Sequence, residues 1–129
     1  MAYLAIVTVL ALVEFTAFGI LVSRARAKYG IKAPATSGHE VFDRTHRVHQ
    51  NTLEQLVVFL PALWLFGTFV SSGWAALLGL VFLAARVVYL RGYVADPEKR
   101  GLGFVMGGIA NLVLLLGGLT GALMAAFRA

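Results

Sequence analysis

The chain has 129 residues, of which 60% are hydrophobic and 13% are charged, whereas soluble domains carry about 25% charged residues. It contains no cysteine, which excludes disulfides, thiolate metal sites and a cysteine nucleophile. The formal charge of +5 does not favour a nucleic-acid partner, because basic residues beside apolar segments more often orient a membrane protein and contact anionic headgroups. We therefore expect an integral membrane protein with lipids, and no nucleic acid, as partners.

The first apolar stretch runs from Ala2 to Val22 and is long enough to cross about 30 Å of hydrocarbon. A cleaved signal peptide fits poorly, because no Lys or Arg precedes the stretch and a cluster of arginines follows it. We predict a retained transmembrane helix over residues 2–23. Glu14, near its middle, is either a proton relay or a partner for an internal polar group, and the structural role is favoured.

Three further helices follow in the sequence. The second begins with polar residues, turns apolar at Leu53 and contains Pro61, which is expected to kink it. A very short turn at 71–73 leads to the third. Asp96 and Pro97 supply a cap and a first-turn proline for the fourth. The sequence thus predicts an all-α antiparallel four-helix transmembrane bundle, a single domain over residues 1–129, with helices at about 2–23, 41–71, 74–94 and 97–127.

The basic residues predict the orientation of this bundle. All but Arg128 lie at the first and third connections, namely Arg24, Arg26, Lys28, Lys32, Arg44, Arg47, Arg86, Arg91, Lys99 and Arg100. By the positive-inside rule, these two connections face the cytoplasm and both termini face away. In a bacterium the protein is expected in the inner (plasma) membrane. Arg24, Lys28, Lys32 and Arg91 are interpreted as headgroup anchors.

Two polar stripes enter the membrane from this end. Arg44, Arg47, Asn51 and Glu54 share one helical face, and Arg86, Tyr89 and Tyr93 share another. Ionisable groups at membrane depth are costly and indicate a functional site. Arginines can hold carboxylates, while Glu54 and Asn51 can accept from an ammonium or amide, so a small zwitterionic peptide with several carboxylates fits. Arg100 lies in the first turn of the fourth helix, where the helix dipole disfavours a cation unless an anion is nearby. That anion is either Glu98 or the thiolate of a ligand.

Alternative readings accompany several of these residues. Tyr89 and Tyr93 could belong to an interfacial aromatic belt, although the face they share with Arg86 disfavours it. His46 and His49 could share a metal, but no third ligand is evident and we expect no metal. Half of the 14 glycines fall in the fourth helix, where they serve either packing within the bundle or contact between subunits.

Two segments resemble the signature sequences of the MAPEG family, the membrane-associated proteins in eicosanoid and glutathione metabolism. They are HRVHQNTLEQLVVFLPALWLFG and GLVFLAARVVYLRGYVADPEKR, and the helix order also corresponds. The chain most resembles the microsomal glutathione transferases and leukotriene C4 synthase. His49 and Gln55 stand where the latter has glutamine and tyrosine. The combination of arginine-x-x-x-asparagine-x-x-glutamate with tyrosine-x-x-x-tyrosine is specific, whereas each pattern alone is weak.

The resemblance implies a homotrimer that binds glutathione, its co-substrate, between subunits at the cytoplasmic side. It implies glutathione-binding roles for Arg26, Arg47, His49, Asn51, Glu54, Arg86, Tyr89 and Tyr93, and a catalytic, thiolate-stabilising role for Arg100. The expected activity is glutathione transfer to lipophilic electrophiles, with reduction of lipid hydroperoxides left open. The alternatives are a noncatalytic lipid- or glutathione-binding protein of the same fold and a small transporter, which lacks support because no inverted repeat is seen.

Overall fold

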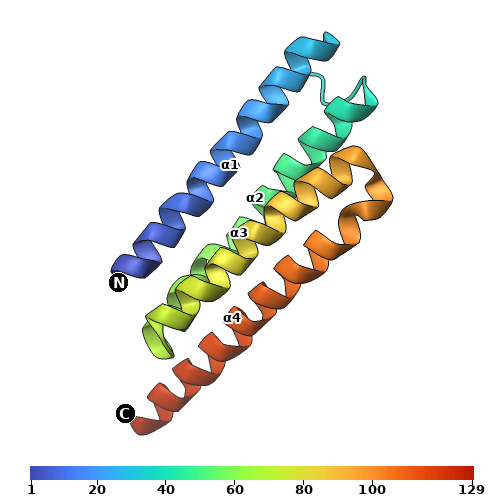
Figure 1. Ribbon diagram of the computed structural model, residues 1–129. Coiled ribbons are helices and arrows are strands. Elements are labelled where there is room, and N and C mark those ends of the chain that lie inside the picture. Colours follow the sequence, from blue (N-terminus) through green and yellow to red (C-terminus); the bar gives the residue numbers. More distant parts are fainter.

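The computed structural model describes all 129 residues as an all-helical bundle, which confirms the predicted class (Figure 1). The long helices are α1 (Ala2–Tyr29), α2 (Glu40–Phe69), α3 (Ser72–Ala95) and α4 (Gly101–Arg128), and a short 3-10 helix, η1 (Pro97–Arg100), precedes α4. Each of the four is long and apolar enough to cross a membrane, α4 together with η1. The first and third connections lie at one end of the bundle, and both termini lie at the other.

The helix ends differ from the predicted ones in two places. α1 continues to Tyr29, six residues past the predicted end, and stops at Gly30, whose φ of 68° is left-handed. α3 begins at Ser72, because the side chain of Ser71 accepts a hydrogen bond from the backbone nitrogen of Trp74 at 3.2 Å. The second turn is therefore shorter than the predicted 71–73.

The start of the last helix places Arg100 at a junction. The side chain of Asp96 accepts from the backbone nitrogen of Glu98 at 3.0 Å, and Pro97 follows at the first position, as the sequence predicts. The residues after this cap form a 3-10 turn, and the α-helical part begins only at Gly101. Arg100 is thus the last residue of η1, directly before the start of α4.

The core lies between α2 and α3, on which both α1 and α4 pack. Phe59 of α2 stacks on Phe82 of α3 at 4.0 Å between ring centroids, and both side chains are fully buried. Many large apolar side chains on all four helices face outward, including Ile6, Val57, Trp74, Leu102 and Leu116. An apolar exterior of this kind suits lipid or neighbouring helices, as expected for a membrane-spanning bundle.

Several glycines of α4 permit close contact inside the bundle. A Cβ at Gly103 would lie 2.6 Å from Cα of Tyr89, and one at Gly121 would lie 2.8 Å from the carbonyl oxygen of Phe69. A Cβ at Gly108 would have no neighbouring atom within 4 Å. Of the two roles considered for these glycines, packing within the bundle accounts for Gly103 and Gly121.

We expect Gly103→Ala to lower stability by about 1–3 kcal/mol, because its methyl group would force α4 away from the backbone of α3. Gly108→Ala is the matched control, and should leave stability unchanged or raise it by up to about 1 kcal/mol through helix propensity. Thermal unfolding of both variants in detergent, followed by circular dichroism, measures the difference. Equal stability of the two would contradict the tight α3–α4 contact.

Candidate functional site

A polar cavity of about 330 Å³ lies at the basic end, where α2, α3 and α4 meet. Its lining comprises Arg47, Asn51, Tyr89, Tyr93, Arg100, Gly101 and Phe104. The structure thus brings together five of the residues that the sequence singled out, from three different elements. Arg47 and Asn51 lie one turn apart on α2, and Tyr89 and Tyr93 lie one turn apart on α3.

Glu54 joins the rim of this cavity through Arg47. The Arg47 Nη1 donates to Glu54 Oε1 at 3.4 Å, and about half of each side chain is exposed. An exposed pair of this length contributes about 0–1 kcal/mol, so a ligand can replace it at little cost. Both groups are therefore available, the arginine to an anion and the carboxylate to an ammonium.

Arg86 lies beneath the cavity and is not one of its lining residues. Its side chain is 1% exposed. Its Nη2 donates to Asn51 Oδ1 at 2.8 Å and to Thr52 Oγ1 at 2.9 Å, and its guanidinium stacks against the Tyr89 ring at 4.4 Å. The Thr52 hydroxyl donates a hydrogen bond to the carbonyl oxygen of Val48 at 2.8 Å. This buried arginine holds two of the cavity-lining side chains in place.

The hydrogen bond from Arg86 determines which group Asn51 offers to the cavity. The carbonyl oxygen of Asn51 already accepts from Arg86, whereas its amide nitrogen makes no hydrogen bond within the chain and is free to donate to a ligand. The sequence interpretation has Asn51 accept from an ammonium or amide, and the structure adds an amide nitrogen that can donate to a ligand. The cavity presents mainly donors, namely two guanidinium groups, an amide nitrogen and two phenols, which suits an anionic ligand.

Arg100 carries a charge without an internal counter-ion. The two ion pairs in the structure are Arg44 with Glu40 and Arg47 with Glu54, so Glu98 does not fill the role considered for it. The guanidinium carbon of Arg100 lies 6.0 Å from the centroid of the Tyr93 ring, at the mouth of the cavity. A ligand anion in the cavity can therefore use this charge.

Two predicted binding residues lie elsewhere in the same chain. The guanidinium of Arg26 donates to the carbonyl oxygen of Ala35 at 2.8 Å and lies 4.9 Å from the centroid of the Phe42 ring. His49 stacks on Phe15 at 4.4 Å, on the α1 side of α2. Neither residue lines the polar cavity. Within one chain, the structure does not bring them to the other site residues.

Two further residues for which the sequence left alternatives open are His46 and Glu14. His46 stacks on Phe42 at 5.9 Å between ring centroids, so the two histidines face different aromatic side chains. Glu14 is half-buried on α1 and makes no hydrogen bond or ion pair.

Sequence reasoning missed Thr52, Gly101 and Phe104. A hydroxyl directly after Asn51, just before the helix turns apolar at Leu53, was a signal for Thr52, since such a group needs a partner at membrane depth. Gly101 follows Arg100 directly, and Phe104 follows it by four residues, a spacing that shares one helical face. Apolar side chains such as Phe104 carry no polar signal and are found only from the fold.

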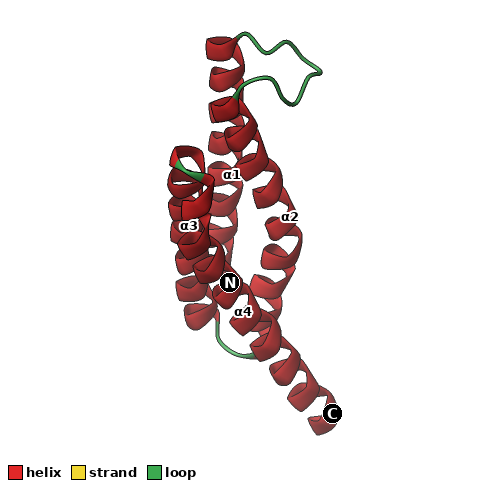
Figure 2. Cartoon of the chain, turned by 90° about the vertical axis from the view of Figure 1, so that its right-hand side faces the viewer, coloured by secondary structure: helices red, strands yellow, loops and turns green.

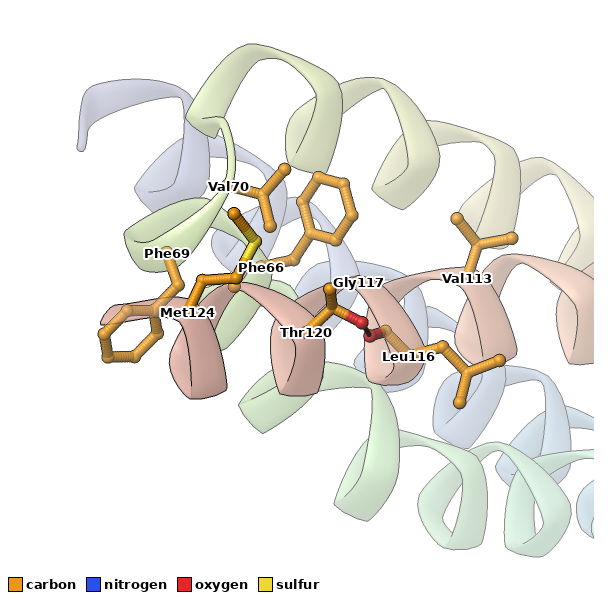
Figure 3. Close-up of a pocket in the computed structure, with 9 residues that line it drawn as sticks. Phe66, Phe69, Val70, Val113, Leu116, Gly117, Thr120 and Met124 are labelled. Carbon is orange, nitrogen blue, oxygen red and sulfur yellow. Dashed lines mark hydrogen bonds between the residues drawn. The ribbon is translucent and has the colours of Figure 1, made fainter. Parts of the chain in front are cut away.

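A larger cavity, of about 630 Å³, lies at the opposite end between α2 and α4 (Figure 3). Its lining is almost entirely apolar, with Phe66, Val113, Leu116 and Met124 around Gly117. Thr120 carries the one polar side chain of this lining. It contains no ionisable side chain, so it cannot hold a charged peptide or stabilise a thiolate. The smaller polar cavity remains the candidate site.

Comparisons with known proteins identify the family to which the sequence is similar. Residues 3–120 match the MAPEG family. An uncharacterised protein of Synechocystis sp. is 47% identical over 115 residues, which cover 89% of this chain and 84% of the relative. Microsomal glutathione S-transferase 2 of Homo sapiens is 37% identical over 117 residues, covering 90% and 80%. Leukotriene C4 synthase of Bos taurus is 38% identical over 99 residues, covering 77% and 66%.

Proposed function

Because this chain belongs to the MAPEG family and its four apolar helices make it an integral membrane protein, we propose that it is a membrane-bound glutathione transferase. Glutathione is its co-substrate, and a lipophilic electrophile from the bilayer is the acceptor. The observation that carries the proposal is the convergence of Arg47, Asn51, Tyr89, Tyr93 and Arg100 on one cavity, in a chain similar to microsomal glutathione S-transferase 2.

The chemistry of the cavity matches that of glutathione. The tripeptide carries two carboxylates, one ammonium and one thiol. Arg47 and the amide nitrogen of Asn51 donate to a carboxylate, while Glu54 at the rim accepts from the ammonium. Arg86 acts through Asn51 and Tyr89 and is a positioning residue. Arg100 remains for the sulfur.

The reaction is attack by the glutathione thiolate on an electrophilic carbon. The pKa of an unperturbed thiol is about 8.5. A guanidinium beside the sulfur stabilises the thiolate and so raises its fraction at neutral pH. The sulfur forms the new bond to carbon, the leaving group departs with its bonding electrons, and the thiol proton passes to water. Phe104 gives the cavity an apolar wall for the acceptor. The protein contributes proximity and electrostatic stabilisation.

The purified protein tests this function directly. Incubation with glutathione and an activated aryl halide should yield the thioether at a rate that depends on Arg100, and a parallel reaction with a lipid hydroperoxide measures peroxidase activity. The alternative, a noncatalytic lipid- or glutathione-binding protein, predicts glutathione binding by calorimetry without turnover of either acceptor.

We propose further that the site is completed by a neighbouring subunit in a homotrimer. Arg26 and His49 lie away from the cavity of their own chain, so they can reach glutathione only from another copy. Light scattering of the detergent-solubilised protein should give three times the mass of one chain. A monomer that binds glutathione would refute the shared site.

The basic end is proposed to face the cytoplasm, with one domain spanning residues 1–129. Cysteines introduced at Ser37 and Ser72 lie at opposite ends of the bundle. In intact bacterial cells an impermeant thiol reagent should label position 72 and spare position 37, because the positive-inside rule places the basic end in the cytoplasm. Labelling of position 37 alone would invert the orientation.

A further inference from the structure

A second cavity at the basic end lies on the α1 side of α3, whereas the polar cavity lies on its α4 side. Its volume is about 380 Å³. Leu21 of α1 and Leu90 and Val94 of α3 give it apolar walls, and Thr45 of α2 is buried at its floor. Arg91 is the one charged residue of its lining, which Ala95 completes.

Further cations stand above the outer end of this groove. Arg24 and Lys28 follow Leu21 by three and seven residues, so they continue the same face of α1 toward the first connection. Figure 2 shows α1 and α2 extending beyond the end of α3, so the last turns of α1 continue past the end of the helix that carries Leu90 and Val94. Arg24, Lys28 and Arg91 are all exposed.

These three cations have no internal counter-ion. Neither of the two ion pairs in the structure includes Arg24, Lys28 or Arg91, and no carboxylate lines the groove. The nearby Arg44 is already occupied, since it pairs with Glu40 and donates to the carbonyl oxygen of Val94 at 3.2 Å. An apolar groove therefore opens toward unpaired positive charge.

We propose that this groove is a binding site for one anionic phospholipid. One acyl chain lies between Leu21, Leu90 and Val94, and the phosphate contacts Arg91, with Arg24 and Lys28 attracting the remaining negative charge. Each part of the lipid meets the matching chemistry of the groove, apolar below and cationic above. General headgroup anchoring needs only exposed cations, whereas a groove of this shape holds a single lipid in a saturable way. The site is separate from the glutathione cavity.

Native mass spectrometry of the detergent-purified protein tests the proposal with dioleoyl phosphatidylglycerol and dioleoyl phosphatidylcholine as probes. The wild-type chain should retain one phosphatidylglycerol at concentrations where phosphatidylcholine is lost. Arg91→Ala should weaken that binding by about fivefold, and adding Arg24→Ala should weaken it by about fivefold again. Arg128→Ala removes the same charge at the opposite end of the bundle and should leave binding unchanged.

A variant that keeps the charge separates the groove from the cations. Leu21→Trp adds bulk to the groove wall and should weaken retention of phosphatidylglycerol, with glutathione binding unchanged as a check of the fold. Equal retention of the two lipids, an equal loss in Arg128→Ala, full retention in Leu21→Trp, or displacement of the lipid by inorganic phosphate at the same concentration would each overturn the proposal.

Discussion

Arg100→Ala is expected to keep glutathione bound while its turnover falls by about ten- to a hundredfold, which corresponds to one or two pKa units of the bound thiol. A cation at the sulfur stabilises the thiolate more than the thiol, so its loss affects reactivity more than total affinity. The structure favours this role because Arg100 lines the cavity and has no internal counter-ion.

The measurement has two parts. Calorimetry follows glutathione affinity, and the ultraviolet absorbance of the bound thiolate follows its ionisation, which should move to higher pH in Arg100→Ala. Arg100→Lys should recover part of the activity, since an ammonium is a point charge of different reach. Lys99→Ala is the matched control, because Lys99 is an exposed neighbouring cation outside the cavity. An unchanged thiol titration with normal turnover in Arg100→Ala would remove Arg100 from catalysis.

The bundle could be predicted from the sequence because its signal is simple. Apolar runs of sufficient length, separated by capped turns, leave few alternatives to four antiparallel spans. The helical periodicity also placed Arg47 and Asn51 on one face of α2 and Tyr89 and Tyr93 on one face of α3, and these faces do meet at one cavity. Periodicity gives the direction of a side chain around its helix, which was enough for these four.

Periodicity does not give the depth of a side chain or the direction of its hydrogen bonds. Arg86 shares a face with Tyr89 but lies one turn farther into the bundle, where α2 and α3 are in contact. It is buried there and bonds to Asn51 and Thr52. Only the packed structure fixes that distinction.

For Arg26 and His49, the prediction from sequence was limited for a different reason. A sequence motif identifies residues that serve a site without saying which copy of the chain supplies them. In one chain, α1 and its neighbouring face of α2 lie across the bundle from the cavity, and Arg26 and His49 have local partners there. The proposed site between copies is a property of the assembly, which the sequence of one chain does not describe.

Asn51→Asp is expected to lose at least about tenfold in glutathione affinity while the fold keeps its stability, since a hydrogen bond to a charged group contributes about 1.5–3 kcal/mol. In the wild-type chain, Arg86 occupies the carbonyl oxygen of Asn51, and the amide nitrogen is left to donate to a ligand carboxylate. In the variant, one carboxylate oxygen keeps the bond from Arg86 and gains an opposite charge. The other oxygen replaces the donor and repels an anion.

Thr52→Val separates this effect from damage to the buried network. Thr52 accepts from both Nε and Nη2 of Arg86, at 3.3 and 2.9 Å, but does not line the cavity. Its loss leaves buried donors without a partner, which should lower stability by about 1–3 kcal/mol. Thr52→Ser keeps the hydroxyl and should restore most of that stability.

Calorimetric titration with glutathione and thermal unfolding of the same preparations distinguish the two residues. Asn51→Asp should lose binding with little change in stability, and Thr52→Val should lose stability with the smaller change in binding. If Asn51→Asp bound glutathione as tightly as the wild-type chain, the amide nitrogen of Asn51 would not contact the ligand.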